Sequence, residues 1–427
     1  MTRLPKFVVC LSYYDRFRFR SDAFAALFLA WQIFPLAIVI AVATGVAPLY
    51  GVFCAAIAGF LASVFGDSKI RVTAPNVVFV AVASSIVARE GIIALSLSTL
   101  LAGVLLVFVG VIGLGAGIRM LPRPVVVGFS TGIAVLVVSQ QVPALLGIGS
   151  QIIADPVPRA ALALVRYPVQ IEPHAMILAF ATLILIVACR RASRYIPTSL
   201  IALAIGALLV KFGHFPVHTI ESLFGSDLMS YRMHLAGAFK LDLLGSVLAQ
   251  GFAIAVLVAT ESYQAMGLAA KLTGERSNSN GELFVQGGVN VACAFAGGLP
   301  TSGVSSHTLD NARLGAQTPI AGVLQAVFLV VFLFLMAPLF RFIPLPVISA
   351  LILSSVFSMT NWQEIPHLIK APILEAAAWV ATSLLTIVTD LPIAIAVGML
   401  IGMFIYIRKK PGMASWDVAA RPGPPRT

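Results

Sequence analysis

The sequence places one acidic residue where an acid is costly. Glu261 follows the apolar residues 252–259 and Thr260, in the middle of a segment long enough to cross a bilayer. A carboxylate at the centre of a membrane segment costs about 2.5–3.5 kcal/mol on insertion scales, so it is usually retained for function. Glu261 could bind a proton or a sodium ion and couple that cation to another solute. The alternative is a structural acid that bonds to nearby hydroxyl or backbone groups.

Two short segments carry groups that could bind an anion. Residues 72–79 are expected to form a short extended stretch that leads into a half-helix, with Pro75 suited to the first helical position, and residues 297–308 are rich in glycine, serine and threonine. If each segment forms a half-helix and the two N-termini face one another, their free N–H groups and positive dipole ends converge on one point. The hydroxyls could instead only cap helix ends or pack. The predicted ligands are Pro75, Asn76, Val77, Thr301, Ser302, Gly303, Val304, Ser305 and Ser306.

Two further polar residues are candidates for the same site. Gln32 lies in the first apolar segment and could donate a hydrogen bond to the anion, or equally could form a packing contact between helices. His307 follows the hydroxyl cluster and could titrate near neutrality, although a histidine packed between helices is the more common situation.

Composition decides the class of protein. Hydrophobic residues make up 59% of the 427 residues and charged residues 11%, against roughly a quarter charged in soluble domains. The net charge of +11 comes from short basic clusters between apolar runs, which is typical of membrane topology and argues against nucleic-acid binding. The four cysteines show no metal-ligand spacing, and no nucleotide-binding loop or nucleophilic triad is present. An enzyme or an ATP-driven pump is therefore not expected.

Apolar runs predict fourteen membrane segments. With the N-terminus inside, 21 of the 28 Lys and Arg residues fall on the inner side, so we expect an inner-membrane protein with both termini cytoplasmic. The third and tenth segments are too short to cross a bilayer, which needs about 20 residues. The predicted segments are 23–44, 49–65, 74–88, 92–114, 124–144, 174–190, 198–212, 243–270, 283–297, 302–314, 319–337, 345–359, 372–389 and 391–407.

The two halves of the chain resemble one another. Arg119-Met-Leu-Pro122-Arg-Pro124 is matched by Arg341-Phe-Ile-Pro344-Leu-Pro346, 222 residues later, and Pro75 is matched by Pro300 at an offset of 225. At the same offset of 225 residues, Gln32 in the first segment corresponds to position 257 in the eighth. A seven-segment unit repeated once must enter the membrane from the opposite side. Inverted repeats with interrupted segments at matching places are typical of secondary transporters, in which substrate binds where the broken helices meet.

Several motifs together resemble the SulP family of anion permeases, the sulfate-permease family, over nearly the whole chain. The resemblance implies a core domain and a gate domain, with an anion held between the third and tenth segments. It also implies uptake or exchange of sulfate, bicarbonate, chloride or a dicarboxylate. The motifs lie at 35–41, 45–51, 65–68, 74–75, 121–129, 279–283, 297–300 and 318–322.

Three features depart from the family pattern. Family members usually continue into a cytoplasmic STAS domain, whereas this sequence ends about twenty residues after its last apolar run, so we expect that domain to be absent or supplied by another polypeptide. The family often places an arginine where His307 stands. Sodium-driven members carry a hydroxyl residue four positions after the acid, where this sequence has Ala265, which favours a proton over sodium.

The sequence therefore predicts an all-α polytopic membrane protein with fourteen segments in two inverted seven-span repeats. We expect a cytoplasmic segment at 1–22, repeats at 23–212 and 243–407, an extracytoplasmic loop at 213–242 and a cytoplasmic tail at 408–427. The expected function is cation-coupled transport of sulfate or bicarbonate by a homodimer in contact with lipid, with no cofactor beyond a coupling Na+ or H+. A passive anion channel or exchanger, or a permease for nucleobases, remains the alternative.

Overall fold

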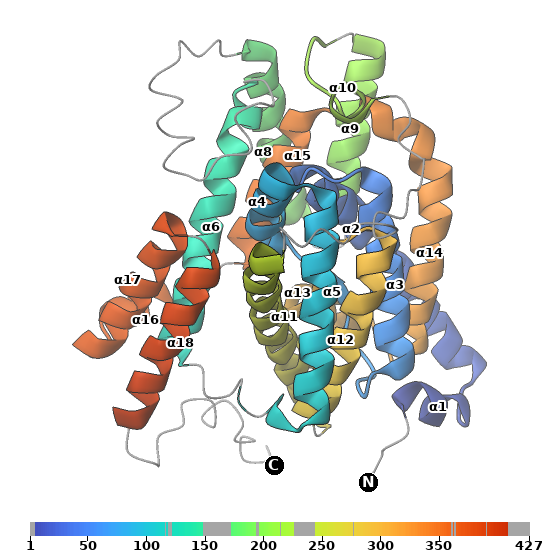
Figure 1. The fold of residues 1–427 in the computed structure, drawn as a ribbon. Helices are drawn as coiled ribbons and strands as arrows, with labels where there is room; N and C mark the ends of the chain where they lie inside the picture. Colours follow the sequence, from blue (N-terminus) through green and yellow to red (C-terminus); the bar gives the residue numbers. More distant parts are fainter. Residues whose placement is uncertain are drawn as a thin grey trace.

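The fold is a bundle of apolar helices that surrounds one very short sheet (Figure 1). The computed structural model describes residues 5–115, 117, 122–147, 172–193, 196–213, 215–225, 244–275, 277–359, 362, 364–389 and 391–408. The elements up to residue 225 are α1 (Lys6–Leu11), α2 (Arg16–Ala43), α3 (Pro48–Phe65), β1 (Thr73–Pro75), η1 (Val77–Phe79), α4 (Val80–Glu90), α5 (Ile92–Val111), α6 (Arg123–Leu145), α8 (Pro173–Ala192), α9 (Thr198–Gly213) and α10 (Ile220–Phe224).

The elements of the second half follow a similar order of helices and one strand. They are α11 (Leu244–Thr273), α12 (Ser279–Ala296), β2 (Thr301–Gly303), α13 (Ser305–Arg313), α14 (Ile320–Met336), η5 (Ala337–Phe342), α15 (Leu345–Met359), α16 (Ile365–Ile369), α17 (Ile373–Val388) and α18 (Leu391–Arg408).

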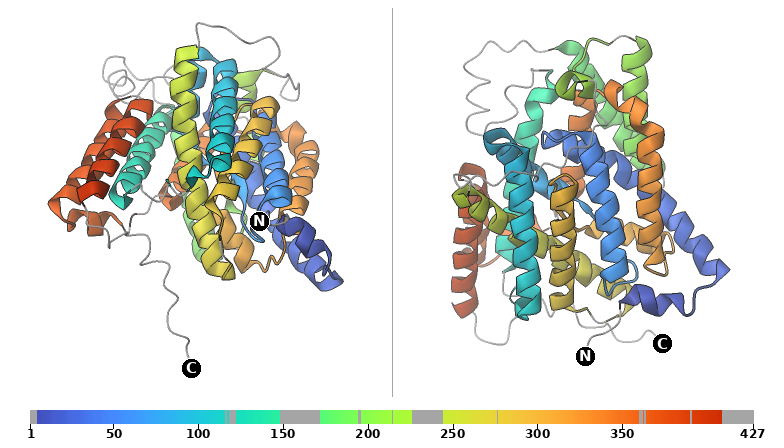
Figure 2. Two further views of the ribbon diagram at one scale, coloured as in Figure 1. Left: turned by 60° about the horizontal axis from the view of Figure 1, so that its bottom comes forward. Right: turned by 45° about the vertical axis from the view of Figure 1, so that its right-hand side comes forward.

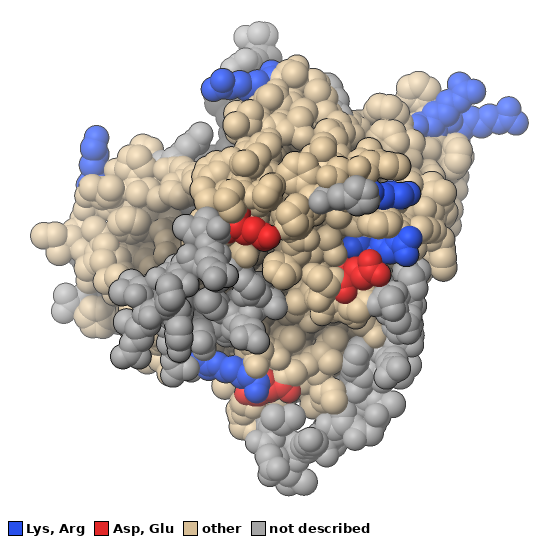
Figure 3. All heavy atoms as spheres, turned by 90° about the horizontal axis from the view of Figure 1, so that it is seen from above, with Lys and Arg blue, Asp and Glu red and all other residues tan. Residues whose placement is uncertain are grey.

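The helices have the length and surface of membrane segments. By length and composition, seven helices among the described residues could cross a membrane, and four shorter apolar helices accompany them. Large apolar side chains such as Phe108, Ile184 and Phe334 lie on the outside of the bundle with more than half of their surface exposed. On the end of the bundle seen from above, charged side chains form a few small groups, some of them basic and acidic side by side, among uncharged ones (Figure 3). The large apolar side chains exposed around the outside of the bundle suit lipid better than water.

The described helices pack in two groups. In one group, α5 packs against α11 and α12, and α14 packs against α2 and α3. In the other group, α6 packs against α15 and α17, and α8 packs against α9 and α15. Figures 1 and 2 show α6, α17 and α18 side by side, set apart from the α3, α5 and α12 group. The short sheet and its two following helices belong to the first group.

Two of the expected segments are interrupted, as the sequence indicates. The third consists of β1, η1 and α4, and the tenth consists of β2 and α13. The N-terminal boundary differs, because α2 begins at Arg16, within the segment 1–22 expected to precede the first span. The expected loop 213–242 contains the short helix α10, its residues 214 and 226–242 lie outside the described residues, and so do residues 409–427 of the expected tail.

Glycines allow α5 and α12 to approach closely. A Cβ atom added at Gly287 would lie 2.5 Å from the backbone nitrogen of Val107 and 2.6 Å from the carbonyl oxygen of Gly103, whereas one at Gly288 would meet nothing within 4 Å. The two adjacent glycines of α12 therefore have opposite roles, because only Gly287 faces the neighbouring backbone.

We expect Gly287→Ala to lower thermal stability, since overpacking against backbone typically costs about 1–3 kcal/mol. The matched variant Gly288→Ala should leave stability unchanged or raise it slightly, because alanine favours a helix over glycine. The melting temperature of each purified variant, followed by size-exclusion chromatography after heating, measures both. Equal melting temperatures for the two variants would contradict the close crossing of α5 and α12.

Candidate functional site

The two interrupted segments meet in an antiparallel pair of strands inside the bundle. Thr73 pairs with Gly303, Ala74 with Ser302, and Pro75 with Thr301. All six residues are buried. In this way residues more than 200 positions apart in the chain are placed side by side, and the helices that follow the strands begin on opposite sides of the pair.

Two neighbouring helices satisfy the backbone of β2. The Gly303 N–H donates to Ser262 Oγ of α11 at 3.0 Å. The Thr301 N–H donates to Asn290 Oδ1 of α12 at 2.9 Å, and Asn290 Nδ2 donates back to the Thr301 carbonyl at 2.9 Å. A buried backbone group without such a partner would cost about the free energy of a lost hydrogen bond. The strand therefore depends on these side chains.

The starts of the two half-helices differ. Asn76 caps η1, because its Oδ1 accepts a hydrogen bond from the Val78 N–H at 3.4 Å. The N-cap residue of α13 is Val304, and no side chain among the described residues caps that helix. The alternative in which the serines of this segment only cap the helix start is therefore not seen for α13. Free N–H groups and the positive end of the dipole make an uncapped helix start a suitable place for an anion.

The prediction that Pro75 opens a helix is wrong. Pro75 is the last residue of β1 and pairs with Thr301, and the helical turn begins two residues later at Val77. A proline is tolerated at the end of an edge strand, where its missing N–H is not needed. Asn76 occupies the position between strand and helix, and its side chain supplies the cap that proline could not.

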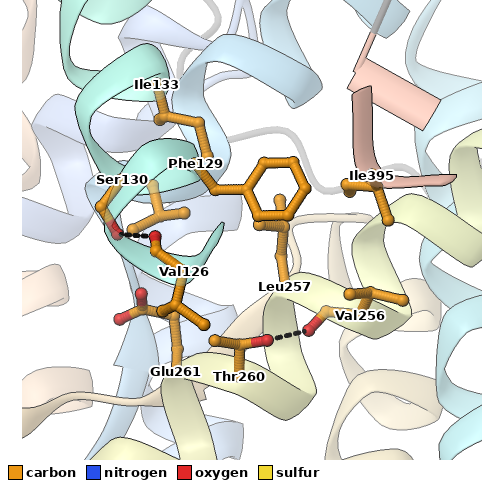
Figure 4. A pocket seen from close by; sticks show the side chains of 10 residues that line it. Val126, Phe129, Ser130, Ile133, Val256, Leu257, Thr260, Glu261 and Ile395 are labelled. Atoms are coloured by element: carbon orange, nitrogen blue, oxygen red, sulfur yellow. Dashed lines mark hydrogen bonds between the residues drawn. The ribbon is translucent and has the colours of Figure 1, made fainter. Parts of the chain in front are cut away.

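Glu261 lies next to this junction. Its Oε2 accepts a hydrogen bond from Asn76 Nδ2 at 3.1 Å, which joins α11 to the end of β1. Glu261 is half-buried and lines a pocket between α11 and α6. Figure 4 shows Glu261 and Thr260 on α11, opposite Val126 and Phe129 on α6. The pocket thus lies between the two groups of helices, and apart from Glu261, Thr260 and Ser130 its lining is apolar.

The other expected ligands do not line this pocket. Val77 is buried in η1, Ser305 is half-buried and Ser306 is exposed at the start of α13, and Gln32 is half-buried on α2. His307 is 8% exposed, and neither of its ring nitrogen atoms has a hydrogen-bond partner within the described part of the chain. A buried imidazole without partners is available to a ligand.

Several residues of the site were not expected from the sequence. Val78, Ser130 and Phe129 line the pocket, and Ser262 and Asn290 hold β2. The spacing of four residues between Gln286 and Asn290 in an apolar helix was a signal for a polar face. The pocket residues of α6 carried no such signal, because an apolar side chain at a site looks like any other apolar side chain.

We expect Ser262→Ala to loosen β2, since it leaves the buried Gly303 N–H without an acceptor at a cost of about 1–3 kcal/mol. The control is Ser85→Ala, which removes a hydroxyl that bonds to the Val82 carbonyl of its own helix. Thermal melting of both purified variants measures the difference. If Ser262→Ala melts no earlier than Ser85→Ala, then α11 does not support the strand.

Comparison with known proteins identifies relatives along most of the chain. The profile of the sulfate permease family matches residues 19–382. YvdB of Bacillus subtilis, named as a sulfate transporter, is 28% identical over 397 residues, which cover 93% of this chain and 75% of that protein. The bicarbonate transporter BicA of Picosynechococcus sp. (strain PCC 7002) is 26% identical over 412 residues, which cover 93% of this chain and 72% of that protein.

Solved structures show the same fold. The transmembrane domain of a cyanobacterial bicarbonate transporter BicA superposes with a TM-score of 0.78 at 25% identity, covering 89% of this chain and 98% of that domain. The murine solute carrier 26 family member A9 anion transporter, in its inward-facing state, gives a TM-score of 0.79 at 16% identity, covering 95% of this chain and 71% of that protein. The chain is therefore a member of the sulfate permease family, a multi-pass membrane protein of a family of anion transporters and not of enzymes.

Proposed function

We propose that this protein is a secondary active transporter of a small anion, with sulfate or bicarbonate as substrate, coupled to a cation through Glu261. The observation that carries the proposal is the junction at Asn76, where the half-helix η1–α4 begins and where the amide bonds to the Glu261 carboxylate. The proposed anion site and the proposed cation site would then share Asn76. The names of the relatives YvdB and BicA support sulfate and bicarbonate in particular.

The proposed architecture is fourteen segments in two inverted repeats. The antiparallel pairing of β1 with β2 supports it, because equivalent segments of inverted repeats run in opposite directions. In this arrangement the group containing α2–α5 and α11–α14 is the core, and the group containing α6, α8, α9, α15, α17 and α18 is the gate. The first described helix and the end of α18 lie toward the same end of the bundle (Figure 1), which suits an even number of crossings with both termini cytoplasmic.

In the proposed anion site, the substrate binds at the starts of the two half-helices. The uncapped N-terminus of α13 supplies N–H groups, and His307 supplies a donor without other partners. Asn76, Ser305 and Ser306 lie at the same helix starts. Such groups hold an anion without a fixed full positive charge, which leaves it free to depart. Movement of the core against the gate would expose this site alternately to each side of the membrane.

The proposed coupling ion is a proton. The Glu261 carboxylate has the neutral Asn76 amide as its partner and faces an otherwise largely apolar pocket. Ala265, four residues later on the same helix, offers no hydroxyl oxygen that would complete a sodium site. Protonation of Glu261 would remove its charge before the core moves past the apolar gate surface around Phe129. A homodimer and a separate cytoplasmic regulatory protein also belong to this proposal.

We expect Glu261→Gln to abolish accumulation driven by a proton gradient while anion exchange persists. An inward gradient of one pH unit can sustain up to about tenfold accumulation of a monovalent anion that moves with one proton, since one pH unit corresponds to about 1.4 kcal/mol. The measurement is uptake of isotopically labelled sulfate and bicarbonate into proteoliposomes, with proton and sodium gradients imposed separately.

The control for that variant is Glu221→Gln on α10, outside the pocket, which should accumulate anion like the native protein. Accumulation by Glu261→Gln at the native level would remove Glu261 from the coupling step. If the native protein equilibrates the anion regardless of pH or sodium, it is a passive channel or exchanger. If it moves neither anion but takes up a nucleobase, the anion assignment is wrong.

A further inference from the structure

One face of α12 carries a row of polar side chains inside the bundle. Glu282, Gln286 and Asn290 are spaced four residues apart, so they lie on the same face of the helix. They are at most 2% exposed. Polar groups buried at this depth are retained only when they are hydrogen-bonded, and the destinations of these bonds indicate what the row does.

The first two residues of the row hold the N-terminal side of β1. Glu282 forms an ion pair with Arg71, two residues before the strand, and both side chains are buried. Gln286 Nε2 donates to Thr73 Oγ1 at 3.0 Å and to Glu282 Oε1 at 2.9 Å. The start of β1 is thereby tied to α12 through a charged contact and a neutral one.

The third residue of the row holds β2. Asn290 both accepts from the Thr301 N–H and donates to the Thr301 carbonyl, each at 2.9 Å, so its amide replaces the partner that a third strand would provide. Asn290 Nδ2 also donates to the Gln286 carbonyl at 2.8 Å. One helix face thus contacts both strands, at Thr73 and at Thr301, on opposite ends of the pair.

A pair of three-residue strands is not stable alone, since even a full two-stranded hairpin is marginal. Its geometry must come from a rigid neighbour, and α12 is such a neighbour because Gly287 and Gly103 bring it into close contact with α5. We propose that Glu282, Gln286 and Asn290, the α12 ladder, are positioning residues that fix both strands. They thereby set the spacing between the starts of η1 and α13. The inference rests on the proposed anion site at those two helix starts.

The ladder contributes to transport through geometry, because its side chains bond to the strands and not to the pocket. Loosening β2 should widen the distribution of distances between the two helix starts. The anion then binds more weakly, whereas the movement of core against gate, which does not involve these bonds, continues at a similar rate. The ladder should therefore affect KM more than the maximal rate.

The test compares two asparagines of the same helix. Asn290→Ala removes the two bonds to Thr301, and the control Asn280→Ala removes the bond from the Gly115 N–H to Asn280 Oδ1, which does not involve the strands. Two readouts are taken on the full chain in lipid: hydrogen exchange of peptides containing residues 301–304, and KM and maximal rate for labelled sulfate and bicarbonate.

For Asn290→Ala we expect exchange at residues 301–304 to accelerate by about tenfold or more and KM to rise by about tenfold, as loss of two buried hydrogen bonds implies, with the maximal rate changed less than about threefold. Asn280→Ala should change neither the exchange rate at residues 301–304 nor the KM by more than about twofold. If Asn290→Ala does not fold, Asn290→Asp keeps an acceptor for the Thr301 N–H but loses the donor to the Thr301 carbonyl, and both readouts should change in the same direction.

Unchanged exchange in Asn290→Ala would overturn the ladder's role in holding β2. Faster exchange with an unchanged KM would show that strand spacing does not set anion affinity, and this too overturns the proposal. If the native protein transports neither anion, the proposed function fails instead. Exchange at residues 301–304 still decides whether Asn290 positions the strand, because that readout does not depend on transport.

Discussion

The structure depends on one constraint, which is that polar backbone inside an apolar bundle must find partners within the protein. Continuous helices meet it by themselves, but the chain at 73–76 and 301–304 leaves the helical path. There the backbones of β1 and β2 bond to each other, and side chains of α11 and α12 bond to further backbone groups of β2. Breaking the helices creates the uncapped helix start of α13, so the feature that is costly to fold is also the one at which the anion is proposed to bind.

Glu282 and Glu261, two of the acids inside the bundle, differ in the partners of their carboxylates. Glu282 is paired with Arg71 and also accepts from Gln286, so its charge is balanced and its oxygens are occupied. Glu261 has a neutral amide as its partner and borders a pocket. Removing one partner from a buried ion pair is strongly unfavourable, so Glu282 is held in its ionised, paired form. Of these two acids, Glu261 is the one whose charge could change without breaking a buried ion pair, and this distinction cannot be obtained from residue type alone.

Much of the fold followed from the sequence, because apolar runs and their breaks are local signals. The interruptions at Pro75 and at 297–308 were predictable from single residues in an apolar context, and the same reasoning makes Glu261 a candidate for a functional acid. The pairing of β1 with β2 was not, because three residues carry no strand periodicity and the partners are more than 200 residues apart. The bond from Asn76 to Glu261 and the pocket wall at Phe129 are likewise long-range contacts between residues with no distinguishing local pattern. Pro75 was placed in a helix because its local preference fits both a strand end and a helix start.

The register of the strand pair constrains the length of the chain on both sides. Ala74 lies opposite Ser302 at the centre of only three pairs, and successive strand residues point to opposite faces. One extra residue between Phe65 and Thr73 would shift every partner and turn Thr73 away from Gln286. A compensating change between Ala296 and Thr301 could restore the pairing but would move Thr301 away from Asn290. Insertions and deletions in these two connections should therefore be nearly absent among functional descendants of this chain, whereas substitutions there need satisfy only space and hydrogen bonding.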